Sequence, residues 1–311
     1  MEDLGWLFMK FAITSNSEDT VLTLFDTDTG KVLKIETDER GFDYTSDGKK
    51  ERPPHKPFGI TWNKDNIFIA NRSNLLIYDS DLKFVKSING ILDTNTHQIA
   101  YYENQIIATM TRQDCIRFIN LEDYSYETFH IDDGWDEYQP SHNYHINSLV
   151  AKDNLLYIML HNRARKHSQI LIFNLDTREK EDLIGTMIND ANGLYLNGNT
   201  IGYLNSYKHN IHLYHDRHKN SNYNGSEKIY EPSFNGYLRG MAGDKNTIVV
   251  GHFPPQKRHF RGFGDAYISI FENKKFVKEY RIDDIGGIND IRRIDGEDFC
   301  HHNKHLFPFE F

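Results

Sequence analysis

The stretch HINSLVAKDNLLYIML at residues 145–160 decides the fold, because its form repeats along the chain. It begins with polar side chains, continues as an apolar run, turns at Lys152-Asp153-Asn154 and returns as a second apolar run. Asp and Asn tolerate the left-handed backbone that a tight hairpin turn requires. The stretch therefore predicts two antiparallel strands joined by a short turn.

Four further stretches share this form, and a fifth shares it more weakly. They recur every 41 to 50 residues, a period typical of β-propeller blades. Each stronger unit continues into a third apolar run that ends near Asp or Asn, and then into a more polar fourth run. The stretches are KPFGITWNKDNIFIAN from Lys56, HQIAYYENQIIATMT from His97, DANGLYLNGNTIGYLN from Asp190, YLRGMAGDKNTIVVGH from Tyr237 and the weaker GINDIRRIDGEDFCHHN from Gly287.

The two ends of the chain complement each other. The N-terminal region supplies three strand-like runs, FMKFAITSN, VLTLFDTDTG and KVLKIE, whereas the last unit has an opening strand but no third or fourth one. Joining the ends completes a blade and removes the exposed edges of an open array. We predict an all-β, six-bladed β-propeller, with N- and C-terminal strands sharing the closing blade and one domain over residues 1–311. Five or seven blades are the alternatives, and FAITSN and FCHHN both compete as second strand of the closing blade.

Composition excludes several classes of protein. The hydrophobic fraction is 38%, the mean hydropathy is -0.65 and no run of 18 apolar residues occurs, so we expect no membrane-spanning helix. The N-terminus has no basic segment before an apolar one, and the two cysteines, Cys115 and Cys300, form no disulfide framework. A net charge of -9 argues against nucleic acid and anionic membrane surfaces as partners. We expect a soluble, cytoplasmic protein.

The channel of a propeller is lined by the first strand of every blade, so equivalent positions from different blades converge there. Positions two apart on a strand point to the same side. Two sets of side chains are therefore expected to face the channel at different depths. The outer set is Lys56, His97, His145, Asp190, Tyr237 and Gly287, and the inner set is Phe58, Ile99, Asn147, Asn192, Arg239 and Asn289.

These two sets suggest a metal site. Two imidazoles, His97 and His145, with the carboxylate of Asp190 suit a first-row divalent metal such as zinc or iron, with a position left for water or substrate. A calcium ion would instead take oxygen ligands, which Asn147, Asn192, Asn289 and Asp290 offer. A different interpretation is that the Asn and Asp side chains form turns and the imidazoles only bind backbone at the channel mouth.

The openings HQIA, HINSLV, DANGLY and LRGMA, each followed by a hairpin, resemble the six-bladed propeller superfamily of the NHL-repeat, senescence-marker/gluconolactonase, paraoxonase and strictosidine-synthase-like groups. This resemblance implies a central calcium site built from several blades. His252 adds a third imidazole, and a set of His97, His145 and His252 looks like the three-histidine zinc site of peptidyl-hydroxyglycine amidating lyase. That likeness implies catalytic roles for Arg239 and Tyr237.

Substrate recognition is expected from loops near the same mouth. Residues 132–144 are acidic and residues 254–265 are basic, so the pair suits a small charged or zwitterionic ligand, unless the loops only pair with each other. The sequence thus predicts a metal-dependent hydrolase or lyase acting on a small polar molecule, or else a non-catalytic module that binds a peptide, sugar or protein. The expected substrate-binding residues are Asn147, Asn192, Asn289, His161, Arg258 and Arg261.

Overall fold

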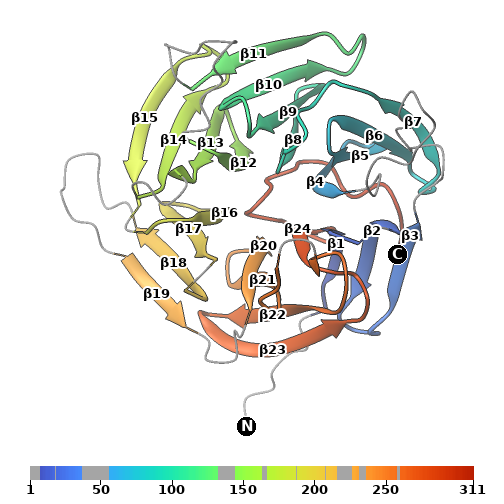
Figure 1. The fold of residues 1–311 in the computed structure, drawn as a ribbon. Coiled ribbons are helices and arrows are strands. Elements are labelled where there is room, and N and C mark those ends of the chain that lie inside the picture. Colours follow the sequence, from blue (N-terminus) through green and yellow to red (C-terminus); the bar gives the residue numbers. More distant parts are fainter. Residues whose placement is uncertain are drawn as a thin grey trace.

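The strands of the chain form six separate four-stranded sheets around one axis (Figure 1). Paired strands within the sheets run antiparallel, because each strand follows its neighbour through a turn or short connection. This computed structural model describes residues 8–17, 19–36, 56–131, 144–162, 167–186, 188–206, 208–215, 226–230, 236–257 and 260–311. The six sheets confirm the predicted six-bladed β-propeller.

Five blades use four consecutive strands each, and the first strand of each blade lies innermost. Their bounds are as follows: blade 1, β4 (Pro57–Trp62), β5 (Asn66–Asn71), β6 (Asn74–Asp79) and β7 (Phe84–Ile88); blade 2, β8 (Ile99–Tyr102), β9 (Gln105–Met110), β10 (Cys115–Asn120) and β11 (Tyr126–His130); blade 3, β12 (Ile146–Lys152), β13 (Leu155–Leu160), β14 (Gln169–Asn174) and β15 (Lys180–Gly185); blade 4, β16 (Ala191–Asn197), β17 (Thr200–Asn205), β18 (Asn210–His215) and β19 (Ser226–Tyr230); blade 5, β20 (Tyr237–Gly243), β21 (Thr247–Phe253), β22 (Ala266–Glu272) and β23 (Lys275–Ile282).

The closing blade combines the two ends of the chain, as predicted. Its strand order is β24-β1-β2-β3, with β24 (Ile288–Arg293) innermost, followed by β1 (Lys10–Ser15), β2 (Thr20–Asp26) and β3 (Val32–Glu36). The register from Phe11↔Arg293 to Thr14↔Asp290 joins residues almost the whole chain apart. FAITS is therefore the second strand of this blade, and FCHHN at 299–303 contains no strand.

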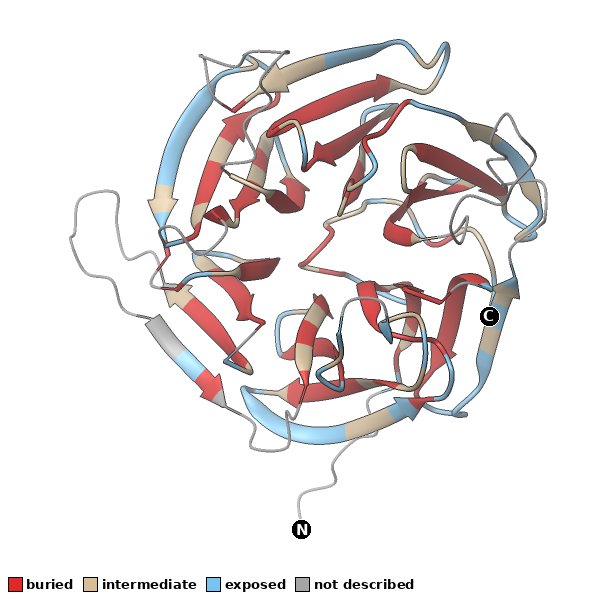
Figure 2. Ribbon diagram, viewed as in Figure 1, coloured by how far each residue is buried: buried red, intermediate tan, exposed pale blue. Residues whose placement is uncertain are grey.

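Burial decreases from the inner strands to the outer ones (Figure 2). All seven residues of β2 are buried, whereas β3 beside it alternates between exposed and intermediate residues. Inner strands pack on the faces of both neighbouring blades, so they read as continuous apolar runs. The fourth strands lie at the outer edge of the blades, where most of their residues are exposed or intermediate, which explains their more polar sequences.

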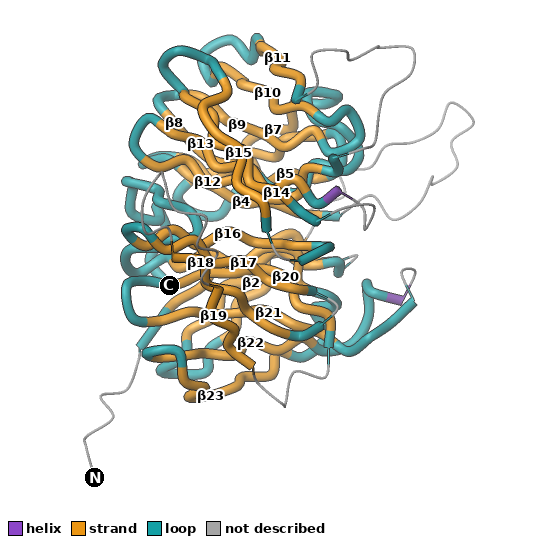
Figure 3. Tube along the Cα trace, turned by 90° about the vertical axis from the view of Figure 1, so that its left-hand side faces the viewer, coloured by secondary structure: helices purple, strands orange, loops and turns teal. Residues whose placement is uncertain are grey.

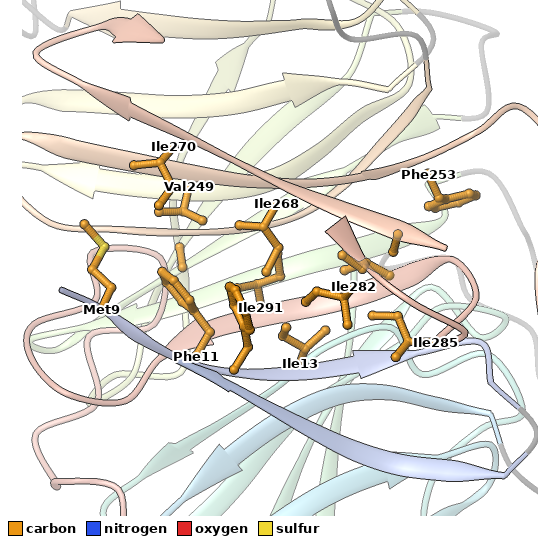
Figure 4. Packing of buried hydrophobic residues seen from close by; sticks show 14 residues of the cluster. Met9, Phe11, Ile13, Val249, Phe253, Ile268, Ile270, Ile282, Ile285 and Ile291 are labelled. Atoms are coloured by element: carbon orange, nitrogen blue, oxygen red, sulfur yellow. The ribbon is translucent and has the colours of Figure 1, made fainter. Parts of the chain in front are cut away.

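Apolar side chains hold the blades together. Figure 4 shows the packing between the closing blade and blade 5, where Phe11 and Ile13 of β1 meet Val249 of β21 and Ile268 of β22. Burial of one such side chain stabilises the fold by about 1.5–3 kcal/mol. Blade contacts of this kind continue around the ring, because first strands of neighbouring blades also contact each other.

The segment after β24 closes one end of the channel. Figure 1 shows it crossing the middle of the ring, and Figure 3 shows the C-terminus on one face of the propeller. Phe299 donates its N–H to Gly243 O of blade 5, and its carbonyl accepts from Leu196 N of blade 4. On blade 1, Trp62 Nε1 donates to His305 O at 2.9 Å. The segment therefore ties three blades together at this end. Among the described residues, no helix is long and apolar enough to cross a membrane.

Candidate functional site

The opposite end of the channel, here called the mouth, carries the openings of the blades. Side chains at the ends of other strands hold these openings through the backbone. Asn71 Oδ1 accepts from Lys56 N at 2.6 Å, and Thr109 Oγ1 accepts from His97 N at 3.1 Å. Asp114 Oδ1 accepts from His145 N at 2.8 Å. The positions of the predicted residues are thus set by partly buried hydrogen bonds rather than by the turns alone.

Three imidazoles and a carboxylate form a row across blades 2, 3 and 4, which we call the histidine row: His97, His145, His161 and Asp190. The ring centroids of His97 and His145 lie 5.4 Å apart, and those of His145 and His161 lie 5.1 Å apart. His161 Nε2 lies 3.3 Å from Asp190 Oδ1. The structure therefore brings together His97, His145 and Asp190 as the sequence predicts, and adds His161 from the end of β13.

Arg239 of β20 reaches the histidine row from blade 5. One of its guanidinium nitrogens contacts His97 Nδ1. A guanidinium can only donate, so His97 Nδ1 is the acceptor in this contact. Phe58 packs edge-on against His97, and both Arg239 and Lys56 lie within 6 Å of its ring, at 5.6 and 5.8 Å. The buried ring of Phe58 thus lies close to two cations.

Two residues of the row have left-handed backbone conformations. His145 has φ 49° and Asp190 has φ 58°, each directly before the first strand of its blade. This conformation is uncommon for residues with a Cβ and costs free energy, so the surrounding contacts must hold it. For His145 the contact is with the buried carboxylate of Asp114, which also accepts from Tyr144 N.

His252 lies elsewhere. Its Nε2 contacts Ser269 Oγ at 3.1 Å and Glu279 Oε2 at 3.0 Å, and its ring stacks on Tyr267, all within blade 5. Burial lowers the pKa of His252. The sequence interpretation placed His252 at the channel mouth. In the structure this second-strand side chain packs on the face of its own blade instead.

The described residues include no group of three or more His, Cys, Asp or Glu side chains arranged to hold a metal ion. One nitrogen of His97 already accepts from Arg239. A metal at the mouth, and the identity of that metal, stay predictions.

The inner set of Asn residues serves mainly to join blades. Asn147 Nδ2 donates to Asn192 Oδ1 at 2.6 Å, and Asn192 Nδ2 donates to Ser206 Oγ at 2.6 Å. Asn289 Nδ2 donates to Pro57 O at 2.7 Å, across the closing blade and blade 1. These amides are buried and engaged with protein groups, as in the alternative interpretation of structural hydrogen bonds. Their role in substrate or calcium binding stays a prediction.

A buried ion pair blocks the channel below this layer. Arg292 Nη2 lies 3.0 Å from Asp290 Oδ2, and both side chains are almost fully buried. Gln98 Nε2 donates to Asp290 Oδ1 at 3.1 Å, while its Oε1 accepts from Leu149 N. Burial raises the pKa of Asp290 to about 6, although Arg292 opposes this shift. Our sequence reasoning did not include Gln98 and Arg292, yet Arg292 stands two residues after Asp290 on a first strand and so shares its side.

The order of contacts along β4 gives the depth of each layer. From the mouth inward, Phe58 packs on His97, Ile60 N donates to Asp290 Oδ2, and Thr61 meets His301 of the closing segment. A cavity of about 460 Å³ lies at the closed end, beside Trp62, Lys152 and residues 301–306. None of the predicted site residues lines it. Buried side chains therefore lie between the mouth and the closed end of the channel.

The remaining predicted residues lie at the rim of the mouth. Arg261 stacks over the ring of Tyr237 at 4.7 Å and lies 5.8 Å from that of Phe253. Tyr237 and Arg239 are two residues apart on β20 and neither is fully buried. Arg258 lies outside the described residues, as does most of the predicted loop at 132–144.

No protein-family model matches the chain, and no curated protein matches it. Among solved structures, a chain in a nidogen/laminin complex superposes with a TM-score of 0.63 at 10% identity, covering 92% of this chain and 98% of that one. A protein of unknown function from Bacteroides caccae gives 0.60 at 9% identity, covering 93% and 100%. A luciferin-regenerating enzyme gives 0.54 at 13% identity, covering 74% and 77%.

The chain has the six-bladed β-propeller fold. At these identities the similarity carries the fold alone, because propellers with the same architecture have unrelated functions. Function has to be argued from the mouth.

Proposed function

We propose that the mouth of this propeller binds a small anionic molecule, such as a carboxylate or a phosphate compound. The observation that carries the proposal is the convergence of Arg239 and the histidine row, which come from four blades. The buried ion pair of Asp290 and Arg292 lies below them in the channel. A guanidinium recognises the planar carboxylate group and the phosphate group better than other side chains do.

The charges of the described mouth residues favour an anion. Lys56 and Arg239 both lie near the ring of Phe58, and Asp190 is the carboxylate of the row. Imidazoles can add donors, since each ring carries at least one N–H. Sites where a few polar groups converge are typical of small-molecule binding.

Thermal shift measurements test this proposal. Acetate, succinate, citrate, phosphate and sulfate would be compared with chloride at equal ionic strength. At about 100 times its Kd, a bound anion should stabilise the protein by about 2.7 kcal/mol, which for a chain of this size raises the Tm by about 4 °C. The shift should vanish in Arg239→Gln and persist in Lys64→Gln, a change of an exposed lysine at the closed end.

The proposal fails if none of these anions shifts the Tm, or if Arg239→Gln responds as fully as the wild type. Isothermal titration with the anion that raises the Tm most measures the stoichiometry, and we expect a single site in the wild type that is lost in Arg239→Gln.

A second candidate is the metal-dependent hydrolase or lyase predicted from the sequence. The contact between His161 and Asp190, with His145 beside them, is the observation in its favour, because two imidazoles and a carboxylate suit zinc or iron. A bound metal would polarise a carbonyl or activate water. Elemental analysis after dialysis decides: stoichiometric metal that is lost in His145→Ala supports this candidate, and its absence from the wild type rejects it.

A further inference from the structure

The cavity of about 460 Å³ at the closed end of the channel, here called the closed-end cavity, lies far from the mouth. Its wall comes from three parts of the chain: Trp62 ends β4, Lys152 ends β12, and the other main wall residues lie between 293 and 306. Small-molecule sites typically measure about 300–1,000 Å³. The closed-end cavity is therefore large enough for a small ligand.

Rings form much of the wall of this cavity. Trp62 and His301 pack edge-on with their centroids 4.8 Å apart, and Phe299 stacks on His302 at 5.3 Å with 6° between the ring planes. Stacked and edge-on ring pairs stabilise a contact by about 0.5–1.5 kcal/mol beyond the effect of the buried area. The wall therefore favours a flat aromatic ligand that continues this packing.

His302, on the cavity wall, has a free hydrogen-bond acceptor. Its Nε2 lies 3.0 Å from Leu196 O, and a carbonyl oxygen can only accept, so Nε2 carries the proton. Burial lowers the pKa of His302, so the ring is neutral at pH 7 and Nδ1 keeps its lone pair. Nothing in the described part of the chain binds this nitrogen. A ligand with an N–H or O–H group would supply the donor.

The neighbouring imidazole on the wall also has a nitrogen without a partner. His301 is 3% exposed, and its Nε2 lies 2.8 Å from Thr61 Oγ1. Its Nδ1 is buried and makes no hydrogen bond to any described residue. A buried polar atom left unpaired costs about 1–3 kcal/mol, so native proteins usually satisfy it with a protein group or a bound molecule. Two consecutive residues of one wall thus lack partners.

The charges of the wall balance. Three cations and three acids line the cavity: Lys152, Arg293 and Lys304, and Asp153, Glu297 and Asp298. Arg293 pairs with Asp244 and Asp295, and the buried carboxylate of Asp298 accepts from backbone nitrogens, including Cys300 N at 2.9 Å. Two lysines and two acids remain, so a ligand of zero net charge matches the wall better than an anion or a cation does.

We propose that the closed-end cavity is a second binding site, which takes a small aromatic molecule of zero net charge that carries an N–H or O–H donor. The ligand ring packs against the rings of the wall, and its donor binds His302 Nδ1. Nucleosides and aromatic amino acids share this chemistry, the first as neutral molecules and the second as zwitterions. The inference concerns the end of the channel opposite the mouth and does not rest on the function proposed above.

Saturation-transfer difference NMR with the full chain tests the inference. The test compounds are adenosine, guanosine, uridine, phenylalanine and tryptophan, and the comparison compounds are ribose and leucine, which lack an aromatic ring. At least one aromatic compound should bind. Isothermal titration should then give one site, with a Kd at least tenfold lower than that of the comparison compound.

Two variants change the cavity wall by different means. His302→Phe keeps a flat ring beside Phe299 and removes the acceptor. Gly296→Phe adds a ring to the wall, where the new Cβ would first meet the flexible guanidinium of Arg293 at 3.2 Å. Each variant should weaken binding at least tenfold. The matched control is Gly185→Phe on the outer strand β15, where a Cβ meets nothing within 4 Å, and it should change the Kd less than twofold.

The inference is overturned if no aromatic compound binds, if ribose or leucine binds as tightly, or if the wall variants bind like the wild type. Urea unfolding shows which variants are folded, and Gly296→Phe alone decides if His302→Phe does not fold without its bond to Leu196 O. Nucleosides or amino acids as the tighter ligands show whether the site takes a neutral molecule or a zwitterion.

The variant Arg239→Gln separates this site from the anion site proposed at the mouth. It should abolish the effect of small anions and leave the binding of aromatic compounds unchanged. Loss of aromatic binding in Arg239→Gln would place that binding at the mouth and overturn the inference. Aromatic binding that depends on the cavity wall stands even if no anion stabilises the protein.

Discussion

Replacement of Arg292 by methionine tests the buried ion pair that floors the mouth. Arg292 is fully buried, lies 3.0 Å from Asp290 Oδ2 and donates to Cys300 O at 2.9 Å. Methionine is flexible and close in length, so the change removes the charge and the donors while leaving a small cavity. The carboxyl of Asp290 then remains in the interior without its cation.

The cost follows from the pKa of Asp290. Burial raises that pKa to about 6 in the folded protein, and Arg292 lowers it. A raised carboxyl pKa means that the folded state binds a proton more readily than the unfolded state, so stability falls as pH rises from about 4 to about 6. Without Arg292 the pKa rises further, and this loss continues above pH 6.

Each pH unit is worth about 1.4 kcal/mol for one carboxyl. The pH-dependent part of the destabilisation should therefore be close to zero at pH 5.5 and about 2 kcal/mol at pH 7.5. The unpaired Cys300 carbonyl adds about 1–3 kcal/mol at either pH. The total at pH 7.5, about 3–5 kcal/mol, is that of a broken buried ion pair.

Urea unfolding followed by tryptophan fluorescence at pH 5.5, 6.5 and 7.5 measures these values. The control is Arg281→Met, the same substitution at a residue whose side chain is 60% exposed and pairs with Asp265 and Asp283. Exposed pairs contribute less than about 1 kcal/mol. The reasoning is refuted if Arg292→Met costs the same at pH 5.5 and 7.5, or no more than the control.

Three further predictions concern the packing around the channel. Burial raises the pKa of the Cys115 thiol to about 12 and that of Cys300 well above its usual range, so iodoacetamide at pH 8 should label neither in the native protein; rapid labelling seen by mass spectrometry would contradict their burial. Gly286→Ala should lower the free energy of unfolding by at least about 1 kcal/mol, because φ is 65° and the new Cβ would meet Arg261 O. An unchanged urea midpoint would show that the loop carrying Arg261 is not held against Gly286. Phe307→Ala should cost about 3 kcal/mol by urea unfolding, since the buried ring packs on Trp62 at 5.0 Å; a loss below about 1 kcal/mol would mean that the closing segment is only loosely attached.

Repetition made the fold readable from the sequence. Hairpins such as residues 145–160 depend on local turn chemistry and on apolar runs that return at a regular interval, and both are properties of short segments. The same alignment placed His97, His145 and Asp190 at one end of the channel, because equivalent positions in a propeller converge. Arg239 could be included for the same reason.

Contacts between blades could not be derived in this way. His161 and His252 both stand at ends of second strands. His161 joins the histidine row, whereas His252 packs beside Ser269 within blade 5. Which face of a blade such a side chain meets depends on register and on bulges, such as the one in β20 between Leu238 and Met241. The hydrogen bond between Asn147 and Asn192 likewise could not be derived, because it depends on how blades 3 and 4 are placed relative to each other.

The sequence by itself predicted six blades, with five or seven as alternatives, the shared closing blade and the ring of openings, because each follows from local pattern and period. The tertiary structure alone decided that FCHHN leaves the sheet and seals the far end, and that Asp290 and Arg292 meet in the interior. Those features depend on whole-chain closure, which sets β1 beside β24 and determines which polar groups must find partners once water is excluded.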